Sequence, residues 1–156
     1  MLYNVYVSAQ PMLFDLEPLV AVPRSVGQAL VTKRRVSQIL TKATGMLKSL
    51  DFTLNPYVGC SFACSYCYAA FFQPDEVKVR DWGYWVEVKE NALELLRRES
   101  RLAGSHVMVG SVTDPYQPLE RTTGLTRSLM EYMASARPQP RIRIQTRSPI
   151  VVRDID

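Results

Sequence analysis

Three cysteines lie close together in the stretch 55–69, and they are the residues of this chain best suited to metal chemistry. Cys60, Cys64 and Cys67 are its only cysteines, and they are spaced Cys-x3-Cys-x2-Cys. Nothing is left over for a disulfide or a stray core thiol, so the pattern predicts a shared metal site. Thiolates are soft ligands that suit iron–sulfur clusters or zinc, and do not suit magnesium or calcium.

The number of cysteines favours an iron–sulfur cluster with one vacant coordination position. A 4Fe–4S cubane normally takes four cysteines, one for each iron. With three, one iron keeps an open position, which a small molecule that offers an amine and a carboxylate could chelate. We therefore expect Cys60, Cys64 and Cys67 to hold a 4Fe–4S cluster that also binds a small-molecule cofactor.

Two other interpretations of the cysteines stay open. Positions 60, 64 and 67 follow the helical period i, i+4, i+7, so they could be core residues of a helix. Gly59 and the polar, aromatic-rich surroundings do not resemble a core helix. A structural zinc site could instead combine the cysteines with His106. Such sites usually pair two short ligand clusters, whereas His106 stands alone in a Gly-Ser turn.

The elements around the cysteines predict an α/β fold with a parallel sheet. Three β-prone stretches predict core strands, at 51–54, 107–109 and 141–146. A further strand or edge extension is expected at 82–89, and helices at 90–101 and at 124–136, the latter capped by Thr122. Alternating strands and helices indicate parallel strands with right-handed crossovers. The cysteines follow the first core strand, at the carboxyl end where such folds bind ligands.

Composition and charge bound the class of protein. With 156 residues, 47% of them hydrophobic, the chain is long enough for one domain with a real core. No stretch approaches the ~20 apolar residues of a membrane span, and no signal peptide begins the chain, so we expect a cytoplasmic protein. A net charge of +4 permits contact with nucleic acid without requiring it. We expect an N-terminal extension over 1–36, with 8–30 an extended arm, and a core domain over 37–156.

At the cysteines the sequence resembles the radical SAM superfamily, whose signature is Cys-x3-Cys-x-aromatic-Cys, with Tyr66 as the aromatic residue. Four further stretches narrow the resemblance to proteins related to spore photoproduct lyase: Leu54–Tyr57, Trp85–Lys89, Thr113–Pro118 and Arg153–Asp156. The resemblance covers about residues 37–156. It implies the N-terminal half of a (β/α)6 radical SAM barrel, with a parallel sheet and flanking helices.

The resemblance also implies an activity and a set of site residues. Such an enzyme reductively cleaves S-adenosylmethionine at a 4Fe–4S cluster, with an electron from an external donor, and the resulting radical abstracts hydrogen from a substrate, for which DNA is a candidate. Cys60, Cys64 and Cys67 would ligate the cluster, and Tyr66 would lie near the adenine. Thr113 would contact the cofactor through its hydroxyl. Arg147, where the family usually has lysine, could pair with the cofactor's carboxylate.

Two departures from the family pattern limit what carries over. Spore photoproduct lyase uses a cysteine as hydrogen-atom donor where this chain has Ser111, and a hydroxyl is a much poorer donor, so we do not expect thymine-dimer repair by that route. The chain also has room for about three strands and two helices, half of the usual six units. We expect it to be part of a longer core or to need a partner. The alternative function is a structural zinc-binding or nucleic-acid-binding module without catalysis.

Overall fold

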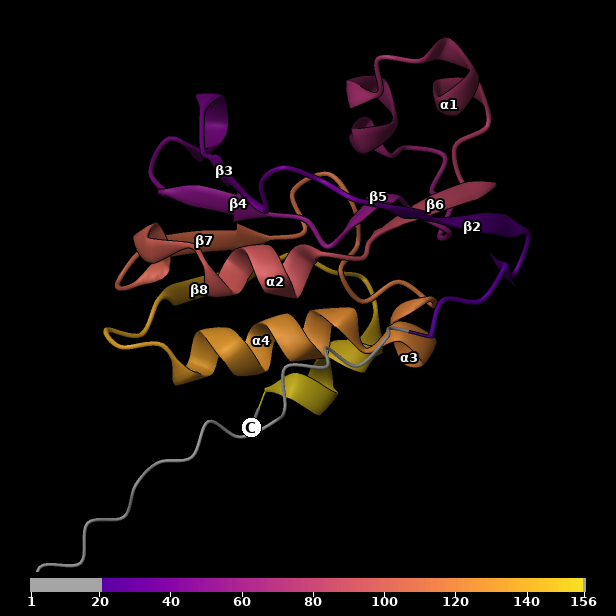
Figure 1. Cartoon of the computed structure of the whole chain (residues 1–156). Coiled ribbons are helices and arrows are strands. Elements are labelled where there is room, and N and C mark those ends of the chain that lie inside the picture. The colour runs from indigo at the N-terminus through magenta and orange to yellow at the C-terminus, as the bar shows by residue number, and fades with distance from the viewer. Residues whose placement is uncertain (1–20, 156) are drawn as a thin grey trace, which may run out of the picture.

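The structure is a computed structural model that describes residues 21–155, and it is a mixed α/β fold (Figure 1). Its strands are β1 Ser25–Val26, β2 Ala29–Arg34, β3 Leu40–Lys42, β4 Phe52–Leu54, β5 Tyr57–Gly59, β6 Trp85–Lys89, β7 His106–Val109 and β8 Arg141–Ile144. Its α-helices are α1 Glu76–Arg80, α2 Ala92–Arg97, α3 Glu120–Thr123 and α4 Leu125–Ser135. Four 3-10 helices cover Gly45–Leu47, Tyr68–Phe72, Ser100–Leu102 and Pro149–Asp154.

The strands form two small mixed sheets. In the sheet β3-β4-β7-β8, the strands β4, β7 and β8 are parallel and β3 is antiparallel to β4. These three parallel strands are the predicted core strands, which confirms that part of the prediction. In the sheet β1-β2-β6-β5, only β2 and β6 are parallel. The expected parallel sheet is therefore only part of the fold, because each of the two sheets also contains antiparallel strands, and within residues 21–155 neither sheet closes into a barrel.

Two helices cover one side of the β3-β4-β7-β8 sheet. Figure 1 shows α2 and α4 lying side by side next to its strands. Leu96 of α2 and Leu129 and Met133 of α4 are fully buried, and they join Leu54 and Val109 of the sheet in one hydrophobic core. Burying each such side chain contributes about 1.5–3 kcal/mol relative to leaving it exposed. This core fixes the ends of β4, β7 and β8, from which the candidate site is built.

Three predicted element boundaries need correction. The helix expected over 90–101 is α2, Ala92–Arg97, and it is preceded by Asn91, whose side-chain amide bonds both the N–H and the C=O of Val36. Thr122 does not cap α4, because it lies within α3 and Gly124 occupies the N-cap with a φ of 57°. Of the arm expected over 8–30, residues 8–20 lie outside the described residues. The rest supplies β1 and the start of β2. None of the described helices has the length and apolarity to cross a bilayer.

Candidate metal and cofactor site

The six residues that the sequence indicates as site residues line one cavity of about 220 Å³: Cys60, Cys64, Tyr66, Cys67, Thr113 and Arg147. The cavity lies beyond the carboxyl ends of two parallel strands, because its walls include Gly110 and Ser111 after β7 and Gln145 and Thr146 after β8. Residues from three distant parts of the chain therefore meet where α/β folds usually bind ligands.

The cysteine loop follows β5 and has a constrained backbone. Cys60 is buried, Cys64 and Cys67 are half-buried, and all three are free thiols. Ala63 has a φ of 50°, in the left-handed region that residues other than glycine seldom occupy. It packs against Gly83, where an added Cβ would lie 2.3 Å from the Cβ of Ala63. The loop therefore packs against the turn between α1 and β6. Only a glycine at position 83 leaves room for this contact.

Gln117 holds the cysteine loop to the rest of the site. Its side chain is fully buried, and its Oε1 accepts hydrogen bonds from the N–H of Ser61 at 2.9 Å and from the hydroxyl of Ser61 at 3.2 Å. Its Nε2 donates to the carbonyl of Gly59 at 3.4 Å and to Oγ1 of Thr113 at 3.3 Å. These four bonds use the full capacity of the amide. The sequence analysis did not identify Gln117 as a site residue, although it lies in the stretch Thr113–Pro118 that the family resemblance includes.

Thr113 and Asp114 position the neighbouring loops. The hydroxyl of Thr113 donates to the carbonyl of Gly59 at 2.5 Å, so its proton is used inside the protein although the residue lines the cavity. Both oxygens of Asp114 are also occupied. One accepts from the N–H of Tyr116 and the hydroxyl of Thr146, and the other accepts from the N–H of Arg147 at 2.9 Å. Asp114 therefore ties the loop after β7 to the loop after β8.

Arg147 lies against the cysteine loop. Its Nη1 donates to the sulfur of Cys64 at 2.7 Å, and its guanidinium stands over the ring of Phe62 at 5.2 Å. Its role as a partner of a cofactor carboxylate stays a prediction. Tyr66 is 80% exposed at the mouth of the cavity, where its ring is free to contact a ligand.

Ser111 is held at the cavity wall by two neighbours. Its hydroxyl accepts from Nδ2 of Asn55 at 3.0 Å, and its carbonyl accepts a hydrogen bond from the hydroxyl of Tyr68. Oδ1 of Asn55 also accepts from the N–H of Val112 at 3.1 Å. Asn55, in the Leu54–Tyr57 lead-in to the cysteines, thereby couples the end of β4 to the loop after β7.

Burial raises the pKa of the Cys60 thiol to about 11, and the negative charge of Asp114 acts in the same direction. Hydrogen bonds from the backbone of Phe62 and Asp114 oppose the shift without cancelling it. Cys60 is therefore a neutral thiol in the metal-free chain at pH 7. A metal must displace its proton on binding, because the thiolate is the ligand.

Three thiols and one carboxylate are the metal donors that line the cavity. Within residues 21–155, no three His, Cys, Asp or Glu side chains stand close enough to hold one metal ion. In a 4Fe–4S cubane each cysteine would bind a different iron, so such a cluster would not need three of these side chains around one ion. Because the carboxylate of Asp114 is already hydrogen-bonded, sulfur is the donor that the cavity offers.

His106 is too far away to join the cysteines in a zinc site. It is the first residue of β7, and the cavity begins at Gly110, beyond the last residue of that strand. At about 3.3 Å per residue, the strand alone separates His106 from the cavity by roughly 10 Å. The structure therefore does not favour the Cys3His zinc site.

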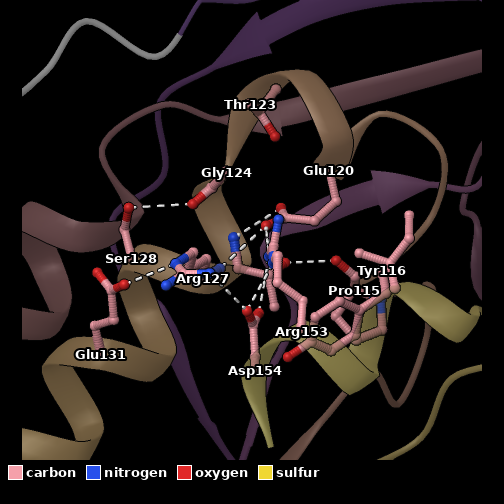
Figure 2. Close-up of polar contacts among 12 residues, drawn as sticks. Pro115, Tyr116, Glu120, Thr123, Gly124, Arg127, Ser128, Glu131, Arg153 and Asp154 are labelled. Carbon is pink, nitrogen blue, oxygen red and sulfur yellow. Dashed lines mark hydrogen bonds and ion pairs between the residues drawn. The ribbon is translucent and has the colours of Figure 1, made fainter. Parts of the chain in front are cut away.

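The buried carboxylate of Glu120 contacts the strand that leads into the cysteine loop. Glu120 is fully buried, and Figure 2 shows it facing Arg153. It accepts hydrogen bonds from the hydroxyl of Tyr57 at 2.6 Å, from Nη2 of Arg153 at 3.0 Å, and from two N–H groups at the start of α4. Burial and the charge of Glu120 raise the pKa of Tyr57 well above its ordinary value, so Tyr57 stays a neutral donor. Tyr57 begins β5, which leads directly into the cysteine loop.

The segment after Ser148 adds further charged residues to the group around Glu120. Arg153 also pairs with Asp154 at 2.6 Å, and Asp154 lies 3.5 Å from Arg127 of α4 (Figure 2). The 3-10 helix Pro149–Asp154 is thus linked to α4 by an ion pair. The stretch Arg153–Asp156, which the sequence resemblance includes, supplies Arg153 and Asp154 to this charged group.

No family model matches the sequence, and no solved structure matches it. Among similar sequences is an uncharacterized protein of Methanocaldococcus jannaschii, 35% identical over 105 residues, which cover 67% of this chain and 38% of that protein. An uncharacterized protein of Acidianus two-tailed virus is 29% identical over 136 residues, with 81% and 44% covered. One of Mycobacterium bovis is 32% identical over 113 residues, with 67% and 32% covered. The chain spans less than half of the length of each of these relatives.

Proposed function

We propose that this chain carries the cluster-binding part of a radical SAM enzyme, in which three strands correspond to the N-terminal half of the (β/α)6 barrel. One observation carries the proposal: the six residues that the sequence indicates as site residues line the same cavity, and they are Cys60, Cys64, Cys67, Tyr66, Thr113 and Arg147. The parallel order of β4, β7 and β8, with the cavity beyond their carboxyl ends, also supports it.

In this proposal the three cysteines would hold a 4Fe–4S cluster, and S-adenosylmethionine would bind beside it in the cavity. Bound there, the cluster supplies the electron that cleaves the sulfonium and so provides a radical for hydrogen abstraction. An external donor would deliver that electron, and DNA is the candidate substrate from the family resemblance.

The chain's own residues would shape and polarise the site. Gln117 and Thr113 fix the carbonyl of Gly59 and the N–H of Ser61 on either side of Cys60, which keeps the loop in one conformation. The exposed ring of Tyr66 at the mouth offers a flat surface for an adenine. Arg147 provides the positive charge in a cavity whose walls are otherwise largely apolar.

Anaerobic reconstitution with iron and sulfide tests the proposal. We expect a brown protein with about four irons and four sulfides per chain, and formation of 5′-deoxyadenosine when dithionite and S-adenosylmethionine are added. Cys64→Ser should lose the cluster, whereas Ser65→Ala, a change at the exposed neighbouring position, should keep it. A colourless, normally folded protein that takes up one zinc would contradict the proposal and favour the structural module. A brown protein that forms no 5′-deoxyadenosine would mean that these residues bind a cluster without catalysis.

A further inference from the structure

The position of Arg147 is determined by three separate contacts, and only one of them involves a cysteine. The carboxylate of Asp114 accepts the backbone N–H of Arg147 at 2.9 Å. The guanidinium lies over the ring of Phe62 at 5.2 Å, and its Nη1 donates to the sulfur of Cys64 at 2.7 Å. Backbone, ring and sulfur therefore all hold this cation beside the cysteine loop. The first two contacts do not depend on what Cys64 itself binds.

The guanidinium is well suited to act on a sulfur. It is planar, always charged and carries several N–H donors in a fixed arrangement, and it stacks on aromatic rings. Hydrogen bonds from a charged donor are roughly twice as strong as neutral ones. A donor of this kind withdraws electron density from a thiolate that is bound to iron. Hydrogen bonds to the sulfurs and nearby charge are among the factors that set the reduction potential of an iron–sulfur cluster.

We propose that Arg147 tunes the cluster through Cys64: its hydrogen bond to the cysteine sulfur raises the reduction potential of the bound cluster and makes the cluster easier to reduce. The inference rests on the proposed function and adds a role for a residue of that site. It assigns to Arg147 an action on the cluster that is separate from any contact with the cofactor's carboxylate. Arg147 acts through Cys64 and is thus a positioning and tuning residue.

The test is a potentiometric titration of the anaerobically reconstituted protein, followed by EPR, without S-adenosylmethionine. In Arg147→Gln the ratio of reduced to oxidised cluster at a fixed potential should fall about tenfold, which for one electron is a shift of about 59 mV to lower potential. Arg147→Lys keeps the charge but loses the planar stacking group, so its shift should be smaller. Phe62→Leu removes the ring under the guanidinium without changing charge, and should shift the potential in the same direction.

Arg143→Gln is the matched control. It removes the same charge from an exposed position of β8, only four residues earlier, and Arg143 is not part of the cavity wall. Its potential should equal that of the unaltered protein. An unchanged potential in Arg147→Gln, or an equal shift in Arg143→Gln, would overturn the inference while leaving the proposed function intact. If Arg147→Gln assembles no cluster, Arg147→Lys and Phe62→Leu decide the question. If the unaltered protein takes no cluster, both proposals fail.

Discussion

Replacing Gln117 by leucine should release the cysteine loop while leaving the fold in place. Leucine is close to glutamine in volume and can occupy the same buried position, but it makes none of the four hydrogen bonds of the amide. The carbonyl of Gly59 keeps the bond from Thr113, so it stays partly satisfied. The N–H of Ser61 loses the partner it has in the structure, and it lies directly after Cys60.

The size of the effect follows from these contacts. A buried donor left without a partner costs about 1–3 kcal/mol, and an ordinary hydrogen bond contributes about 1 kcal/mol. Losing the bonds to Ser61 and weakening those to Gly59 should cost about 3 kcal/mol. The loop relieves the cost by opening locally, so its opening equilibrium should rise by about a hundredfold, since about 1.4 kcal/mol is a factor of ten.

Thiol modification of the metal-free protein measures this opening. Cys60 is 6% exposed, so in the unaltered protein it should react slowly with a thiol reagent, and peptide mapping separates it from Cys64 and Cys67. In Gln117→Leu its rate should rise by about two orders of magnitude. Leu129→Ala is the control, because it destabilises the α4 core by about 2–5 kcal/mol without touching the loop. Equal acceleration in both variants, or none in Gln117→Leu, would refute the assigned role.

Three further predictions concern the surroundings of the site. Glu120→Gln should lower the free energy of unfolding by about 3 kcal/mol, because Arg153 keeps only Asp154 as a charged partner and the donors around Glu120 lose a charged acceptor. A loss of stability under about 1 kcal/mol on urea denaturation would contradict this. Gly83→Ala should lower the free energy of unfolding by about 2 kcal/mol, because the φ of Gly83 is 100° and the new methyl group would collide with Ala63. The cysteines of the displaced loop should then react faster with a thiol reagent. Unchanged stability and thiol reactivity would argue against the packing of Ala63 on Gly83. Burial lowers the pKa of Lys89 to about 8, so Lys89→Met should stabilise the protein by about 1–3 kcal/mol below pH 8. That gain should disappear as the pH rises toward about 10.4, where lysine is neutral in both the folded and the unfolded state; a gain that does not change with pH would refute it.

Patterns that depend on local sequence were predictable. The core strands at 51–54 and 107–109 have β-prone residues, and their order along the chain implied parallel pairing with a ligand site at the carboxyl ends. The second sheet was predictable only in part, because the strand expected at 82–89, which is β6, had a clear alternating pattern. Its strands β1 and β5 have two and three residues, too short for a periodic pattern, and they exist because distant segments pair with them.

Residues whose role depends on tertiary contacts were also out of reach. In the sequence Gln117 has the features of an ordinary turn residue, and only the fold brings its side chain within hydrogen-bond distance of Ser61. The role of Thr113 toward a cofactor stays a prediction, but its hydrogen bond to the carbonyl of Gly59 in the cysteine loop could not be read from the sequence. Thr122 looked like a helix cap because threonine favours that position, but a buried carboxylate from Glu120 bonds the first N–H groups of α4 instead.

The most direct test is EPR of the anaerobically reconstituted, dithionite-reduced protein before and after S-adenosylmethionine is added. If three cysteines leave one iron open to the cofactor, the sample should show a reduced 4Fe–4S signal whose g-values change when the cofactor binds. A protein with all three thiols intact that shows no such signal, or a signal that the cofactor leaves unchanged, would contradict the proposed enzyme.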